Sequence, residues 1–178
     1  GSERSSTWML SKNFEEEVKK LQQLKENNYL AFEKDFLRWM LSDGAGAFLL
    51  ENKKNEQGIS LRIDWMEACS YAQQVESCMY MGCDKNEDGT LKSFKDYETK
   101  EFAENSIFSI KQDVKLLSDN IVKLGAEFLM QLIEKHNTNI EEVTYFLPHL
   151  SSYVFQKPIA DILEENGVPI PEAKWFTN

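Results

Sequence analysis

The longest regular pattern in this sequence is an amphipathic helix in its second half. Its apolar residues recur at steps of three and four, at Ile107, Ile110, Val114, Leu117, Ile121, Leu124, Phe128 and Leu132. Residues spaced in this way lie on one face of a helix, and that face has to be buried against another element. The pattern predicts a helix from residue 107 to residues 136–137, packed on another layer of the chain.

Short apolar segments on both sides of this helix predict strands. Residues 47–50 are an apolar run that follows a turn of small residues, so we expect a buried strand. Residues 59–65 alternate between apolar and polar side chains, which is typical of a strand with one buried face. Residues 143–147 predict a third strand, and residues 175–177 the start of a fourth.

Turn and capping residues mark the remaining boundaries. Residues 84–89 read Asp-Lys-Asn-Glu-Asp-Gly and predict the tip of a hairpin. Ser151 or Ser152 can cap a helix that ends at Gly167. Pro158 lies inside this helix, so we expect a kink or a late start there.

The order of these elements predicts an α/β fold with helices packed on a sheet. The chain has 178 residues, a length that suits one domain with a core of its own. We therefore expect a single domain over residues 1–178. Residues 1–40 form a charged helical lead-in, and residues 41–178 form the sheet-and-helix core.

The charge of the chain limits its partners. Its formal net charge is −10 and its isoelectric point about 4.8, which makes nucleic acid an unfavourable partner. No apolar run reaches the roughly 18–20 residues that a membrane span needs. The three cysteines, Cys69, Cys78 and Cys83, cannot all pair with one another, which favours a reducing cytoplasm.

His149 is the candidate catalytic residue. It follows the predicted strand at 143–147 and precedes a helix, and functional groups gather where strands of α/β sheets end. A neutral imidazole there can donate a hydrogen bond to a developing oxyanion, or transfer a proton near pH 7. The alternative is a partly buried histidine that bonds to a backbone group.

The sequence resembles the β-ketoacyl-acyl-carrier-protein synthase III family in several motifs. Phe146-Leu147-Pro148-His149 is similar to the family's strand-Pro-His-helix motif, and Asp43-Gly44-Ala45-Gly46-Ala47 is similar to its Gly-Asp-Gly-Ala-Gly-Ala segment. The closing residues 174–178 resemble the strand before the family's Gly-Asn-Thr turn. These motifs occur in the family's order and cover nearly the whole chain.

This resemblance implies the C-terminal half of a thiolase-like fold in a longer, homodimeric acyltransferase. Such enzymes condense an acyl thioester with malonyl carrier protein, in fatty-acid or polyketide-type biosynthesis, through a Cys-His-Asn set and without a cofactor. Of that set, only the histidine has a counterpart in this sequence, His149. The nucleophilic cysteine would precede residue 1, and Asn178 falls inside the strand before the Gly-Asn-Thr turn that would hold the asparagine. The resemblance therefore implies acyl-carrier-protein or acyl-coenzyme A partners, a missing N-terminal half and an inactive fragment.

Two other interpretations stay open: a non-catalytic module that binds a carrier protein or another partner, and a small complete domain unrelated to ketosynthases. We do not interpret residues 84–89 as a calcium loop, because Lys95 stands where its twelfth residue should be glutamate. Cys78 and Cys83 lack a second Cys or His pair at zinc-site spacing, so we expect no metal.

Overall fold

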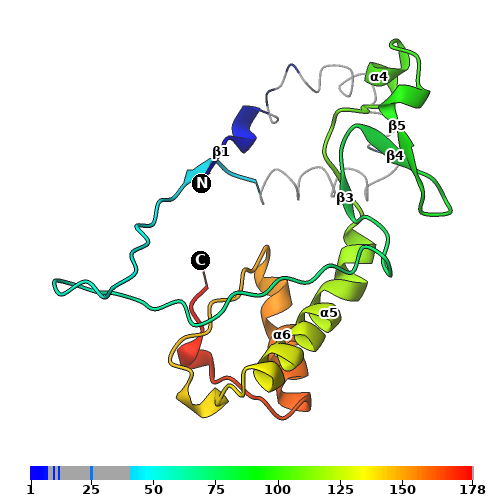
Figure 1. Ribbon diagram of the computed structural model, residues 1–178. Helices are drawn as coiled ribbons and strands as arrows, with labels where there is room; N and C mark the ends of the chain where they lie inside the picture. Colours follow the sequence, from blue (N-terminus) through cyan, green and yellow to red (C-terminus); the bar gives the residue numbers. More distant parts are fainter. Residues whose placement is uncertain (8–9, 11, 13–24, 26–40, 178) are drawn as a thin grey trace. The chain divides into compact units, whose positions relative to one another are not determined.

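The computed structural model describes residues 1–7, 10, 12, 25 and 41–177, and the predicted lead-in over 1–40 lies largely outside them (Figure 1). The chain divides into two compact units, Gly1–Asp113 and Val114–Asn178. Its elements are helices and two-stranded antiparallel sheets, so the α/β class is confirmed. The described residues contain no layered sheet of the thiolase type, and the single domain over 1–178 stays a prediction.

The first unit opens with a short strand pair. β1 (Ser2–Glu3) pairs antiparallel with β2 (Gly44–Ala45), and the 3-10 helix η1 (Ser5–Thr7) follows β1. The carboxylate of Asp43 accepts hydrogen bonds from the hydroxyl of Ser6 at 2.7 Å and from its backbone N–H at 2.8 Å. These two bonds favour the ionised carboxylate and hold the pKa of Asp43 below its ordinary value.

The strands predicted at 47–50 and 59–65 are absent. Both segments lie without regular secondary structure, and their apolar residues, Phe48 and Ile59 among them, are exposed. A strand forms only where another strand pairs with its backbone, and an apolar pattern does not supply that partner.

Residues 79–112 form a segment whose two ends pair with each other, and we call this segment the excursion. β3 (Met79–Tyr80) pairs antiparallel with β6 (Lys111–Gln112), and between them β4 (Cys83–Lys85) pairs antiparallel with β5 (Leu91–Ser93). The β4–β5 hairpin turns at residues 86–90, as the sequence predicted. The 3-10 helix η3 (Phe94–Asp96) and the helix α4 (Glu101–Glu104) complete the excursion.

The excursion contains one fully buried isoleucine and a cluster of three phenylalanine rings. Ile107 is fully buried, and the rings of Phe94, Phe102 and Phe108 pack on one another with centroids 5.3–6.4 Å apart. The backbone of Ile107 bonds to Phe102 and to Gly82. Ile107 is therefore a core residue of the excursion and not the first turn of the long helix.

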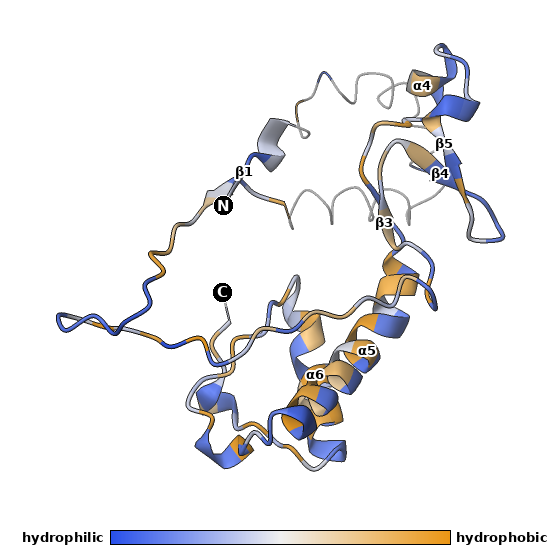
Figure 2. Ribbon diagram, in the orientation of Figure 1, coloured by the Kyte–Doolittle hydropathy of each residue, from blue (hydrophilic) through white to orange (hydrophobic). Residues whose placement is uncertain are grey.

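The long helix of the second unit, α5 (Val114–Lys135), starts seven residues later than predicted and ends where predicted. Asn137 takes a left-handed conformation with φ of 48°, and Thr138 N–H bonds to the carbonyl of Ile133, which closes the helix. Figure 2 shows apolar residues along α5 and along α6 (Gln156–Glu165), and the two helices pack on each other.

The start and end of α6 follow from local sequence. Ser152, and not Ser151, caps the 3-10 helix η5 (Tyr153–Phe155) that leads into α6, because its Oγ accepts the N–H of Val154 at 3.3 Å. Pro158 is the third residue of α6, where no intrahelical N–H is needed, so the late start is confirmed. Gly167, with φ of 74°, ends the helix as predicted.

The remaining elements of the second unit are short. They are the 3-10 helices η4 (Ile140–Glu142) and η6 (Glu172–Lys174) and a single parallel bridge between Phe146 and Trp175. The strands predicted at 143–147 and 175–177 are thus reduced to one bridge. Among the described residues, no helix combines the length and apolarity needed to cross a bilayer.

We expect Gly89→Ala to destabilise the β4–β5 hairpin. Gly89 has φ of 82°, and an added Cβ would overlap the carboxyl group of Glu76. The left-handed conformation alone costs a non-glycine residue about 1–2 kcal/mol. Urea unfolding followed by circular dichroism should show a loss of this size in the unfolding free energy.

Gly125→Ala is the matched control. Gly125 lies inside α5, and an added Cβ meets nothing within 4 Å there. Alanine in a helix interior is favoured over glycine by about 0.5–1 kcal/mol, so this variant should be more stable than the parent chain. Equal effects of the two substitutions would contradict the roles assigned to both glycines.

Candidate functional site

His149 follows a segment that pairs in parallel with the end of the described chain. Phe146 N–H donates to the carbonyl of Lys174 at 2.8 Å, and Phe176 N–H donates to the carbonyl of Phe146 at 2.8 Å. This alternation of bonds is the pattern of a parallel strand pair. His149 comes three residues after Phe146, beyond the carboxyl end of the pair.

Side chains of both segments hold the pair in place. The rings of Phe146 and Trp175 meet edge to face with centroids 4.9 Å apart. The indole N–H of Trp175 donates to the carbonyl of Ile170 at 2.9 Å, and the ammonium of Lys174 donates to the carbonyl of Glu141 at 3.0 Å. The bridge is therefore fixed by one ring pair and two side-chain hydrogen bonds.

Exposure alternates along the segment that leads to His149. Tyr145, Leu147 and His149 are exposed, whereas the intervening Phe146 and Pro148 are half-buried. Successive side chains of an extended segment point to opposite sides, so Tyr145 and Leu147, the neighbours of the bridged Phe146, lie on the side opposite to Phe146. The structure thus leaves the side chain of His149 exposed, as it does those of Tyr145 and Leu147.

The other members of the implied catalytic set do not join His149 in the described residues. Cys69 is exposed, Cys78 is half-buried and Cys83 is buried, and all three are free and lie in the first unit. Cys83 lies in a strand, where its thiol donates to the carbonyl of Met81 at 3.7 Å, and not at a helix N-terminus. Asn178 lies outside the described residues.

The part of the chain that the structure describes contains no group of His, Cys, Asp and Glu side chains suited to a metal ion. Residues 84–89, the segment with a partial likeness to a calcium loop, are occupied by protein contacts. The carboxylate of Asp84 bonds to Lys111 and to the hydroxyl of Tyr97, and Asp88 accepts two bonds from Thr90. The turn is therefore held by its own side chains.

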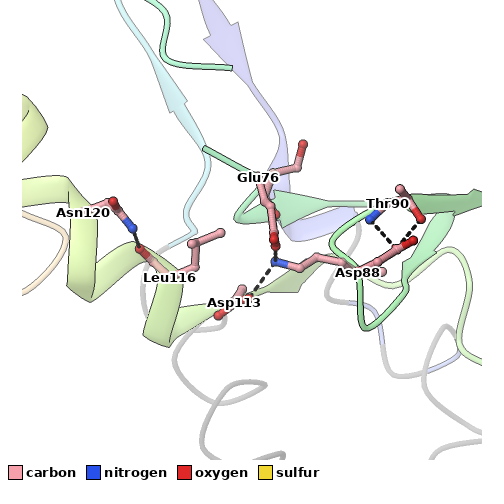
Figure 3. Close-up of polar contacts among 8 residues, drawn as sticks. Glu76, Asp88, Thr90, Asp113, Leu116 and Asn120 are labelled. Atoms are coloured by element: carbon pink, nitrogen blue, oxygen red, sulfur yellow. Dashed lines mark hydrogen bonds and ion pairs between the residues drawn. The ribbon is translucent and has the colours of Figure 1, made fainter. Parts of the chain in front are cut away.

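A lysine bound by two carboxylates joins the two ends of the excursion, and the sequence did not reveal it. The ammonium of Lys85 lies 2.7 Å from a carboxylate oxygen of Asp113 and 3.0 Å from one of Glu76 (Figure 3). Partial burial lowers the pKa of Lys85, but the two carboxylates outweigh this and raise it above its ordinary value. These residues lie far apart in sequence, and no local pattern marks their contact.

Tyr97 is part of a second polar cluster in the excursion. Its hydroxyl donates to Asp84 at 2.8 Å, and the ammonium of Lys92 lies 3.6 Å from the centre of its ring. Removal from water and the bond to Asp84 raise the pKa of Tyr97 to about 12. Both effects favour the neutral phenol, so this cluster has a structural role.

No model of a known protein family matches this sequence, and no curated protein matches it.

The arrangement around His149 supplies one proton-transfer or hydrogen-bonding group. An imidazole can stabilise a developing negative charge or transfer a proton near neutral pH. The described residues place no thiol or carboxylate beside it in the second unit that would form a nucleophile–base pair. Any catalysis that uses His149 therefore needs further groups.

We expect Tyr97 to ionise at higher pH than an ordinary tyrosine. Because its folded-state pKa is raised from 10.0 to about 12, the stability it contributes is present below pH 10 and is lost between pH 10 and 12. A titration followed by tyrosinate absorbance should show a late component in the wild type, one of six tyrosines, that Tyr97→Phe removes.

Tyr153→Phe is the control for this titration, because Tyr153 is an exposed tyrosine of the other unit. That variant should keep the late component. If the late component survives in Tyr97→Phe, it does not arise from Tyr97 and its bond to Asp84.

Proposed function

We propose that this chain is the C-terminal portion of a longer condensing enzyme of the β-ketoacyl-acyl-carrier-protein synthase III type. One observation carries the proposal. His149 stands beyond the carboxyl end of a segment that pairs in parallel with residues 174–176, and the crossover between the two segments contains α6. This is a reduced β-α-β unit with a histidine at the edge where α/β enzymes place functional groups.

The exposed side of the bridge supports the proposal that this chain forms half of a layered, thiolase-like fold. Parallel strands occur almost only in sheets that are covered on both faces. Tyr145 and Leu147 lie exposed on the side of their segment opposite to Phe146, and Phe176 is exposed as well. Apolar side chains so placed require a further layer of helices or sheet, which a five-layered αβαβα arrangement would provide.

In the proposed reaction, a cysteine of the parent attacks an acyl thioester, and the carrier thiol leaves. A malonyl thioester then loses carbon dioxide, and the electron pair of the broken C–C bond forms a carbanion. This carbanion attacks the acyl-cysteine carbonyl, which releases the cysteine thiolate and a 3-oxoacyl thioester. His149 donates a hydrogen bond to the malonyl thioester oxygen, where negative charge develops during decarboxylation.

The residues after His149 favour acyl chains bound to a carrier protein over coenzyme A. Family members resembling this chain often continue His-Gln-Ala-Asn with an arginine two residues on, and those positions face the pantetheine or carrier. Here Leu150, Ser151 and Ser152 follow, and Val154 stands where the arginine would be. The loss of this cation weakens a site for the phosphates of coenzyme A.

The proposal also includes a homodimeric parent enzyme and an inactive fragment. A Cys-His-Asn set acts as a unit, and one member alone retains little of its activity. Within the described residues His149 is the one member with a matching position. The competing interpretation is a non-catalytic module that binds a carrier or another partner and in which His149 is structural.

A single-turnover assay on the longer parent enzyme tests this proposal. With acyl and malonyl carrier thioesters, the wild type should form a 3-oxoacyl product. His149→Ala should reduce the rate by about 10²–10⁴-fold, the range measured when one general acid–base or oxyanion-stabilising group is lost.

His136→Ala is the matched control, because it removes the chain's other histidine, which follows the C-terminus of α5. It should leave the rate within a few fold. A parent enzyme that binds carriers without condensing them would replace the enzyme proposal with the module. Equal rates for His149→Ala and wild type would remove His149 from the mechanism.

A further inference from the structure

Trp175 is held in place at both its backbone and its side chain. Its backbone N–H donates to the carbonyl of Glu172 at 2.9 Å, and its indole N–H donates to the carbonyl of Ile170, also at 2.9 Å. Ile170 stands between Pro169 and Pro171. A proline fixes its own φ and restricts the residue before it to extended conformations. The carbonyl that the indole binds therefore belongs to a stiff stretch of chain.

Trp175 in turn fixes the position of Phe146. The two rings meet edge to face, with centroids 4.9 Å apart and planes at 83°. The residues on either side of Trp175 bond to the backbone N–H and C=O of Phe146, at 2.8 Å each. One ring pair and two backbone bonds thus hold Phe146 in both position and direction.

The chain between Phe146 and His149 is short and stiff. Leu147 and Pro148 are the two residues between them. The ring of Pro148 fixes its φ, and Leu147, as the residue before a proline, is restricted to extended conformations. On the other side of His149, Ser152 caps the 3-10 helix η5. The main chain at His149 therefore runs between two fixed points.

We propose that Trp175 is a positioning residue for His149. Its ring holds Phe146, and the stiff Leu147-Pro148 link transmits that position to the residue that carries the imidazole. A group that stabilises a developing charge has to stand within about 0.5 Å of its productive position, and a displacement of about 1 Å can lower the rate about 100-fold. The consequence for catalysis rests on the proposed function, whereas the placement of His149 by Trp175 does not.

Nitrogen-15 relaxation of the full chain tests the placement without any assay of activity. An ordered backbone amide has an order parameter of about 0.85, and that of a flexible one falls below about 0.6. His149 should lie near the first value in the wild type. It should lie near the second in Trp175→Leu, which removes both the ring pair and the indole bond. Trp175→Phe keeps a ring and loses the indole bond, so its value should lie between the two.

Phe176→Leu is the matched control for this measurement. Phe176 is the next residue and is also aromatic, but its side chain is exposed, and the bond of its N–H to Phe146 is a backbone bond that the substitution keeps. This variant should leave His149 ordered. His136, which follows α5, should keep its wild-type order parameter in every variant and so report that the unit stays folded.

Two results would overturn the placement. One is an order parameter of His149 that is the same in the wild type, Trp175→Phe and Trp175→Leu. The other is an equal fall in Phe176→Leu. If Trp175→Leu lowers the value of His136 as well, the comparison of Trp175→Phe with Phe176→Leu decides the question.

A double-mutant cycle in the longer parent enzyme tests the consequence for the reaction. Trp175→Leu should slow condensation by about 10–100-fold and leave acylation of the parent's cysteine within a few fold, because the proposed reaction uses His149 at decarboxylation and not at acylation. A loss of packing alone would slow both steps. In a His149→Ala background, Trp175→Leu should change the rate by no more than a few fold, because it acts through the imidazole that is already removed.

The outcomes of this cycle separate the two proposals. Losses that multiply in full would overturn the positioning role and leave His149 in the mechanism. A His149→Ala parent that condenses at the wild-type rate would overturn the proposed function, and the order parameter of His149 would still decide whether Trp175 places it.

Discussion

Exposed apolar side chains are the main physical constraint on the part of the chain that the structure describes. Hydrophobic residues make up 42% of the sequence, yet Ile107 and Leu163 are the large side chains that the described residues bury completely. Each belongs to a different local core: Ile107 to the excursion at 79–112, and Leu163 to α6, which packs on α5. The hydrophobic effect favours burial in proportion to apolar area removed from water, so exposed runs such as 47–50 represent stabilisation that only added cover can supply.

The excursion at 79–112 is ordered because polar contacts join its two ends while a small aromatic core fills it. Lys85 draws Glu76 and Asp113 together, and Lys111 and Tyr97 bind Asp84. Exposed ion pairs contribute little on their own, but Lys85 keeps only 12% of its side-chain surface accessible and is shared by two carboxylates. Such a network fixes which residues meet, whereas the phenylalanine rings add apolar contacts with one another.

Local sequence predicted the features that depend on a few neighbouring residues. The turn at 84–89, the end of α5, a cap at Ser151 or Ser152 and the stop at Gly167 each follow from one or two side chains and their backbone preferences. The start of α5 was wrong because Ile107 has helical spacing but packs in a separate core. The strands at 47–50 and 59–65 were wrong for a related reason, since pairing partners are set by distant parts of the chain. His149 was predicted from its place before a helix, and its role stays a prediction, whereas the contacts of Lys85 left no local signal.

The chemistry proposed for His149 and the burial of its apolar neighbours both require that water be excluded from this segment. A hydrogen bond to a developing oxyanion is worth far more in a water-excluded site than in water, because water screens the charge and competes for the bond. His149 is exposed, and so are Leu147 and Tyr145, two and four residues before it. In the proposed enzyme, a further layer over this segment would bury the apolar side chains, remove water from around the imidazole and supply the nucleophile. In the proposed enzyme, the exposed apolar surface and the incomplete Cys-His-Asn set therefore have the same remedy, which is a further layer over this segment.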